Sequence, residues 1–176
     1  MTEPPDERSL RDAAAAGDPF AWRTLFDASY DRVRAYIRWR TGGIADLADD
    51  CEQETWLVAV ARLRRFDPAR SHFAGWVLGI AANVVRAQVR WRKRHRPLTG
   101  NPAAPSLDPA RDRAEAVAVA LAALPARYEA ALRAKYLDGR SVDEMAAADG
   151  ATPKAVESLL TRAREAFRTA YTRADR

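Results

Sequence analysis

The chain of 176 residues contains little cysteine and histidine, the residues that build disulfide frameworks and most zinc sites. A single cysteine, Cys51, cannot form an internal disulfide, so the chain is not a disulfide scaffold. The only histidines are His72 and His95, and neither has a partner at the spacing of metal ligands. We therefore expect no metal, no cofactor and no catalytic chemistry from these residues.

Long apolar runs are also missing. The longest uninterrupted run, Ala116–Leu124, has nine residues, most of them alanine, whereas a transmembrane helix needs about 20. The first residues are acidic, and a secretory signal would instead begin with basic residues followed by an apolar stretch. These features predict a cytoplasmic protein that does not insert into membranes.

Glycine is scarce, with 8 residues, while alanine, the best helix former, occurs 38 times. No segment sustains the apolar–polar alternation of a half-buried strand, so the predicted fold class is all-α. Four of the ten prolines fall within residues 97–113, which predicts a linker there. We expect two small helical domains, residues 1–96 and 114–176, joined by the Pro-rich linker 97–113.

Apolar residues spaced three to four positions apart predict where the helices lie. In the first domain the expected helices cover residues 20–40, 46–65 and 73–94. Trp56, Val60 and Leu63 form the predicted apolar stripe of the second of these. In the second domain the expected helices cover residues 114–124 and 128–137, followed by a pair of helices within residues 141–168.

That last pair has the pattern of a helix-turn-helix. Ser141 and Glu144 form a capping-box sequence at the start of the first helix. Gly150 occupies the turn, and Thr152 precedes Pro153 as a cap precedes the first helical position. In such a motif the second helix enters the major groove of DNA. An ordinary helical hairpin is the alternative. The candidate DNA contacts of the second helix are Thr152, Lys154, Glu157, Ser158 and Thr161, with Arg162 and Arg164 near phosphates.

Positive charge is concentrated in one segment. Residues 62–96 hold ten basic residues and one acidic residue, although the whole chain has a net charge of only +5. This asymmetry indicates a polyanionic partner. Arginines neutralise phosphates and aromatic side chains stack on unpaired bases, although a solvated basic face is the alternative. The candidate contacts are Arg86, Arg90, Trp91, Arg92, Lys93 and Arg94, with Phe66 and His72 in the preceding loop.

A cluster of acidic residues begins the second predicted helix. Asp46, Asp50 and Glu54 follow each other at four-residue spacing, which would suit a metal site on one helix face. Acids favoured by the helix dipole are a second interpretation. A docking face for a basic partner protein is a third.

These pieces, in this order, resemble the extracytoplasmic-function (ECF, group 4) sigma factors of bacterial RNA polymerase. The resemblance covers residues 18–171. Three stretches carry it: the acidic stretch from Asp49 to Val60, the stretch from Phe73 to Asn83 with its Arg-rich continuation, and the stretch from Leu124 to Ala166.

The resemblance implies the function and the partners. Asp49, Asp50, Gln53 and Glu54 would bind core RNA polymerase at the clamp coiled coil of β′, with a further contact to the flap of β. Asn83 and the loop from Phe66 to Phe73 would read an extruded base of the −10 element, and the basic helix end would help to melt it. The helix-turn-helix would read the −35 element. Many members of this family are bound by an anti-sigma factor, and we expect the free chain to be a monomer.

The chain departs from the family pattern at a few positions. Glu157 stands where a basic residue is common, and Leu159 where arginine is common. A carboxylate can accept a hydrogen bond from cytosine but repels phosphate, so an altered −35 preference is expected. Three rival functions remain open: a stand-alone helix-turn-helix regulator, a metal-dependent nuclease, and a related regulator that does not support transcription.

Overall fold

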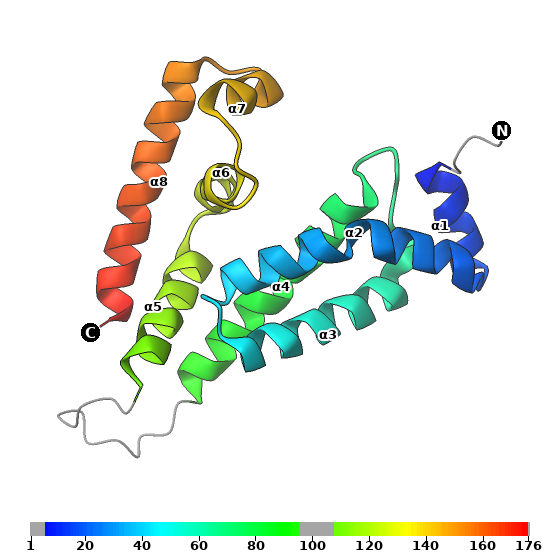
Figure 1. Ribbon diagram of the computed structural model, residues 1–176, viewed down its shortest axis with the longest axis horizontal. Coiled ribbons are helices and arrows are strands. Elements are labelled where there is room, and N and C mark those ends of the chain that lie inside the picture. The colour runs from blue at the N-terminus through cyan, green and yellow to red at the C-terminus, as the bar shows by residue number, and fades with distance from the viewer. Residues whose placement is uncertain (1–5, 96–107, 176) are drawn as a thin grey trace. The chain divides into compact units, whose positions relative to one another are not determined.

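The computed structural model describes residues 6–95 and 108–175, and within them the chain is all-α with no strand (Figure 1). The predicted fold class is therefore confirmed. The elements, in order, are α1 (Glu7–Ala15), α2 (Pro19–Arg40), α3 (Ala45–Arg62), the short 3₁₀ turn η1 (Leu63–Arg65), α4 (Phe73–Arg94), α5 (Pro109–Ala123), α6 (Ala126–Tyr136), α7 (Val142–Asp149) and α8 (Pro153–Ala174). In the parts of the chain so described, no helix is both long and apolar enough to cross a bilayer.

Two helices begin where the apolar pattern does not predict them. Helix α1 was not predicted, and none of its residues is fully buried; it starts where the Asp6 carboxylate accepts from the Ser9 N–H at 2.7 Å. Helix α5 begins at Pro109 rather than at residue 114, since Asp108 caps it and proline suits the first helical turn. The predicted linker thus ends in helix, and its residues 97–107 lie outside the described part of the chain.

The helices divide between two compact units. The first contains the residues up to 38 together with residues 45–88, and the second contains residues 39–44 and those from 89 onward. Aromatic side chains organise the core of the first unit. Phe66 packs at 5.4 Å between ring centroids against both Phe73 and Trp76, while Trp22 contacts Phe73 at 6.2 Å and Trp56 at 6.5 Å. These contacts join α2, α3 and α4 around one aromatic cluster.

The apolar face of α3 differs from the predicted one. Its buried residues are Leu47, Ala48, Cys51, Thr55 and Ala59. Val60, which we expected on the inner stripe, is 54% exposed, and Leu57 is 63% exposed. Apart from Leu47, the residues buried on this face are small, namely Ala48, Cys51, Thr55 and Ala59.

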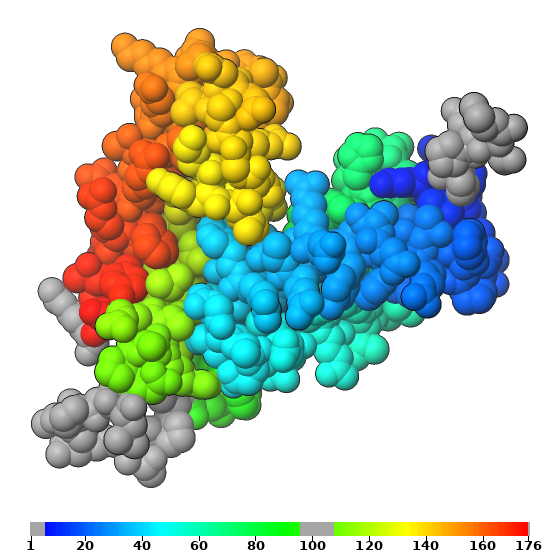
Figure 2. Space-filling view, viewed as in Figure 1, coloured from blue at the N-terminus to red at the C-terminus, as the bar shows by residue number. Residues whose placement is uncertain are grey.

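In the second unit α8 packs against α5, α6 and α7 and runs along one edge (Figures 1 and 2). One buried cluster joins α6, α7 and α8 through Ala131, Met145, Ala146, Val156, Leu159 and Leu160. A second cluster joins α5, α6 and α8 through Leu121, Leu124, Leu132 and Ala163. Helix α8 contributes to both clusters and is the common support of this unit.

The turn between α7 and α8 has the predicted chemistry. The Ser141 hydroxyl accepts from the Glu144 N–H at 3.1 Å, and the Glu144 carboxylate accepts from the Ser141 N–H at 2.7 Å. Gly150 ends α7 in the left-handed region with φ of +60°, where a side chain would be strained. The Thr152 hydroxyl then caps α8 by accepting from the Ala155 N–H at 3.2 Å. The helix-turn-helix is therefore present as expected.

Candidate nucleic-acid interface

The polar residues of α8 fall on one face of the helix. Lys154, Glu157, Ser158, Thr161 and Arg162 follow the i, i+3, i+4, i+7, i+8 spacing of a single helical face, and all are exposed. The opposite face, with Val156, Leu159, Leu160 and Ala163, is buried. The capped first turn of α8 therefore presents a polar surface free of large apolar groups, as a helix that enters the major groove requires.

Arg164 differs from the other residues predicted for this surface. Its Nε donates to the Tyr136 hydroxyl at 2.8 Å, and its guanidinium carbon lies 5.9 Å from the centre of the Tyr136 ring. The side chain is thus held against α6 and is half-buried. Arg162 is exposed, with its Nε 3.3 Å from the Ser158 carbonyl oxygen.

The basic end of α4 is open to solvent. Arg90, Lys93 and Arg94 are exposed, whereas Arg86 and Arg92 are half-buried. Trp91 is 52% exposed, and its ring stacks on that of His95 at 4.7 Å between centroids. An exposed tryptophan among arginines is unusual for a structural residue and offers an apolar face to a flat ligand such as a base.

In the loop between η1 and α4, the middle residues are exposed to solvent and the residues at the two ends are buried. His72 has a side chain that is 94% exposed, while Asp67 folds the loop by accepting from the Ala69 N–H at 3.0 Å. Phe66, which we predicted to contact DNA, is only 1% exposed and lies in the aromatic cluster. Its side chain supports the loop from inside, because a ring of that size is more stable packed against Phe73 and Trp76 than in water.

Asn83 lies in the middle of α4 with its side chain exposed. Its Oδ1 accepts from the Arg86 Nη1 at 3.2 Å, a contact one helical turn along the same face. The two residues predicted to meet −10 DNA at this position are therefore adjacent on the surface.

The acidic residues of α3 divide between two environments. Asp49, Asp50 and Gln53 are exposed. The Glu54 carboxylate is half-buried and accepts from the Gln88 Nε2 at 2.8 Å, which ties α3 to α4. Within the described residues, no three histidine, cysteine or acidic side chains come together as metal ligands would. The geometry therefore gives no support to a metal site at Asp46, Asp50 and Glu54.

An exposed surface that we call the α3 strip continues from these acids along the helix. It consists of Asp49, Gln53, Leu57 and Val60, at spacings of four, four and three residues. Both apolar residues lie in the stretch from Asp49 to Val60 that carries the family resemblance, but neither was named as a candidate contact, and Val60 was expected on the inner stripe. The signal that could have found them is the run of small residues on the other side of the helix.

Glu52 points to a different neighbour. Its carboxylate lies 3.8 Å from the Arg34 Nε, and a hydrogen bond to this carboxylate raises the pKa of the Tyr30 hydroxyl. Glu52 therefore joins α3 to α2 and is not part of the α3 strip.

The capping box makes the helix-turn-helix sensitive to acid. Hydrogen bonds from Ser141 hold the pKa of Glu144 below its ordinary value of 4.5. Because the pKa is lower in the folded state, the ionised Glu144 carboxylate stabilises the fold above the ordinary pKa. This stabilisation is lost as the pH falls through the lowered pKa. We expect Glu144→Gln to destabilise the protein at neutral pH, with the difference from wild type shrinking below about pH 4.5. Urea unfolding at several pH values measures this.

Asp143→Asn is the matched control for that prediction, since Asp143 is an exposed acid in the same first turn. The expectation is contradicted if the unfolding free energies of wild type and Glu144→Gln remain parallel through the acid range.

The comparisons with known proteins match both units. A sequence model of sigma-70 region 2 matches residues 25–96, and one of sigma-70 region 4 matches residues 114–167. The chain belongs to the sigma-70 family. This family consists of DNA-binding transcription initiation factors, and the enzyme they serve is RNA polymerase. The region 2 match includes the basic end of α4, and the region 4 match includes the helix-turn-helix.

Individual proteins resemble the chain to different extents, and the chain spans only about a quarter of the length of the curated relative that it matches. The ECF RNA polymerase sigma factor BldN of Streptomyces coelicolor is 38% identical over 76 residues, which are 43% of this chain and 28% of BldN. The solved structure of CnrH in complex with the cytosolic domain of CnrY has a TM-score of 0.53 and 29% identity, covering 97% of this chain and 99% of CnrH. The sigma factor RpoE in complex with the anti-sigma factor NepR from Bartonella quintana has a TM-score of 0.49 and 22% identity, covering 86% of this chain and 96% of RpoE.

Proposed function

We propose that this chain is an ECF sigma factor of group 4, which binds core RNA polymerase and directs transcription from specific promoters. The observation that carries the proposal is the presence of both sigma-70 regions in one chain, each with an exposed surface suited to its role. In the proposed division, residues 1–96 act at the −10 element and residues 114–176 act at the −35 element. Residues 97–113 form the linker between these two domains. Because it serves RNA polymerase, the protein would work in the cytoplasm.

The α3 strip is the proposed contact with the polymerase. Its acidic end, with Asp49 and the neighbouring Asp50, complements a basic surface, and its apolar end can be buried in an interface. An exposed apolar pair beside charged groups is typical of a protein–protein contact with a hydrophobic centre and a polar rim. We assign it to the clamp coiled coil of β′, and a second contact of the chain to the flap of β.

DNA recognition is divided between duplex and single strand. The exposed face of α8 would read the −35 duplex, and Asn83 with the basic end of α4 would hold the melted −10 strand. Opening DNA costs about 1.4 kcal/mol per base-pair step in lost stacking. Stacking a base on an aromatic side chain returns about 1–3 kcal/mol. Capture of a few bases can therefore make promoter opening favourable once the polymerase holds the DNA.

The free chain is proposed to be a monomer that an anti-sigma factor can hold inactive. CnrH, which resembles this chain over nearly its full length, was solved in complex with the cytosolic domain of another protein, CnrY. That complex supports a protein partner other than the polymerase.

Run-off transcription tests the proposed function. Core polymerase would be supplied with fragmented host DNA, with and without this protein, and discrete protein-dependent transcripts are expected. If the protein binds no core polymerase and yields no transcripts, the sigma function is wrong and a stand-alone helix-turn-helix regulator becomes the better explanation. Binding without transcripts would instead indicate a related regulator that does not support initiation.

Trp91→Ala should impair promoter opening without unfolding the protein. The ring is 52% exposed, so its removal costs little packing, whereas the loss of one stacked base is worth about 1–3 kcal/mol. We expect the yield of open complex, measured by permanganate reactivity of unpaired thymines, to fall about tenfold or more. Phe20→Ala, which removes another exposed aromatic ring, is the control and should change the yield less than about twofold. Wild-type opening by Trp91→Ala would refute a stacking role.

A further inference from the structure

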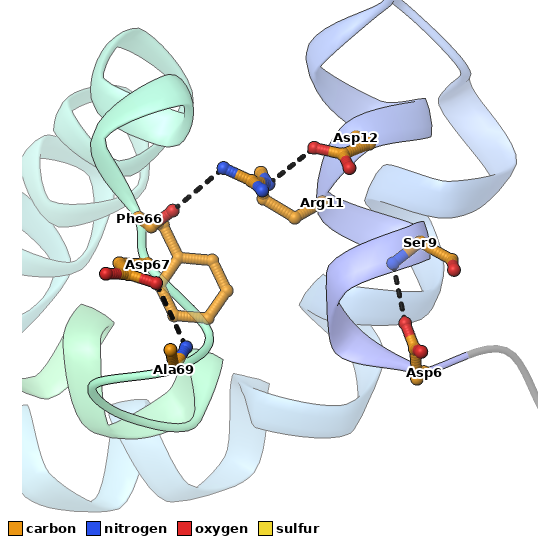
Figure 3. Close-up of polar contacts among 7 residues, drawn as sticks. All are labelled: Asp6, Ser9, Arg11, Asp12, Phe66, Asp67 and Ala69. Carbon is orange, nitrogen blue, oxygen red and sulfur yellow. Dashed lines mark hydrogen bonds and ion pairs between the residues drawn. The ribbon is translucent and has the colours of Figure 1, made fainter.

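Helix α1 lies against the loop between η1 and α4, and both ends of that loop are tied to it. At the start of the loop, the Phe66 carbonyl oxygen accepts from the Arg11 Nη1 at 3.2 Å (Figure 3). At its end, the Phe73 N–H donates to the Glu7 Oε2 at 3.0 Å. The other oxygen of Glu7 lies 3.7 Å from the His72 Nδ1. Helix α1 thus binds backbone groups on either side of residues 67–72, most of which are exposed.

The spacing of the two contacts is set by the helix. Glu7 and Arg11 are four residues apart, so they share one face of α1 and are separated by about 6 Å along its axis. Asp12 Oδ1 lies 2.7 Å from the Arg11 Nε, and this ion pair helps to hold the guanidinium in place (Figure 3). The distance between the two ends of the loop, at Phe66 and Phe73, is therefore set by helix α1.

A third contact extends the same attachment to η1. The Arg64 Nη2 is 3.5 Å from the Ala15 carbonyl oxygen, at the end of α1. From inside, Phe66 and Phe73 fix the same two ends in the aromatic cluster. The ends of the loop are thus anchored from both sides, while Asp67, Ala69, Arg70, Ser71 and His72 remain exposed between them.

We propose that Glu7 and Arg11 are positioning residues for −10 recognition: they hold the loop 66–73 in the shape that receives the extruded base. The proposal rests on the proposed function, since it assigns the loop to −10 DNA. It goes beyond the matched region, because the region 2 match begins at residue 25 and α1 lies before it. A loop ordered in advance loses less entropy when it binds, so α1 raises affinity without contacting DNA.

Hydrogen exchange tests the attachment itself. Glu7→Ala and Arg11→Ala each remove one anchor, whereas Glu7→Gln keeps an oxygen that can accept from the Phe73 N–H. We expect amides of residues 66–74 to exchange about tenfold faster in the two alanine variants, the change expected from losing a charge-assisted hydrogen bond. Glu7→Gln should restore most of the protection. Arg8→Ala, an exposed arginine of the same helix, is the control and should leave exchange unchanged.

Base capture tests the consequence. Full-length protein with core polymerase would be bound to forked promoter DNA carrying either the natural base or an abasic site at the extruded −10 position. The promoter is one obtained from the run-off assay. Wild type and Arg8→Ala should prefer the natural base by about tenfold or more. The preference should fall to about twofold in Glu7→Ala and Arg11→Ala, while affinity for core polymerase is kept.

Each outcome decides. Faster exchange together with a reduced base preference supports the positioning role. Unchanged exchange in both alanine variants, or faster exchange with the full base preference retained, overturns it and leaves the proposed function intact. If wild type itself shows no preference for the natural base, −10 recognition by this loop fails, and the role of α1 fails with it.

Discussion

Asp49→Lys should lower the affinity of the chain for core RNA polymerase by roughly 30-fold or more. Asp49 is exposed at the acidic end of the α3 strip, one turn from Gln53. Placing a lysine where a basic partner surface expects a carboxylate replaces an attraction by a repulsion, and like charges across an interface cost several kcal/mol. About 1.4 kcal/mol corresponds to a tenfold change in the dissociation constant. The measurement is a binding titration of core polymerase with labelled protein.

Asp31→Lys is the matched control for this prediction. Asp31 is an exposed acid on α2 of the same unit, and its replacement makes the same change in net charge. Both variants should melt within about 2 °C of wild type, because surface substitutions usually change stability by less than about 0.5 kcal/mol. Equal loss of affinity in the two variants would mean that only the overall charge matters. Wild-type affinity in Asp49→Lys would remove the α3 strip from the polymerase interface.

Leu160→Ala should destabilise the second unit by about 2–5 kcal/mol, the usual cost of removing a buried leucine side chain. Leu160 is 1% exposed and belongs to the cluster that holds α6, α7 and α8 together. A domain of this size buries little apolar surface, so such a loss is a large share of its total stability. We expect the melting temperature of the unit to fall by more than about 10 °C. Circular dichroism during heating and hydrogen exchange of α8 amides measure the effect.

Two further variants identify the cause of that loss. Leu57→Ala removes the same side chain from a position that is 63% exposed and should cost less than about 0.5 kcal/mol. Leu160→Met keeps the volume of the side chain and should cost less than about 1.5 kcal/mol. If Leu160→Ala proves no more destabilising than Leu57→Ala, the packing of α8 on α6 and α7 is not what stabilises this unit.

The sequence was sufficient for the features that depend on neighbouring residues. The capping box of Ser141 and Glu144, the glycine at position 150 and the cap at Thr152 each act over two to four residues, so their roles could be predicted directly. The same holds for the polar and apolar faces of α8, since helical spacing alone separates Glu157 from Leu160.

Other features depended on which elements pack together. Phe66 and Trp91 are both large aromatics close to basic residues, yet one is buried and the other is half open to solvent. No local pattern distinguishes them, because burial is decided by helices distant in the chain. Val60 was placed wrongly for the same reason: its apolar character says nothing about whether α2 or α4 covers it.

Helix α1 illustrates this division most clearly. Its local sequence favours a helix through the cap at Asp6, although none of its residues is fully buried. Its contacts with Phe66 and Phe73 join residues more than fifty positions apart. Side-chain identity does not predict which backbone groups accept or donate such hydrogen bonds, since every residue has the same carbonyl and nearly every residue has the same N–H. Sequence alone therefore determined most of the helices, the caps around Gly150 and the family that they indicate. Only the tertiary structure decided that α1 holds both ends of the loop 66–73.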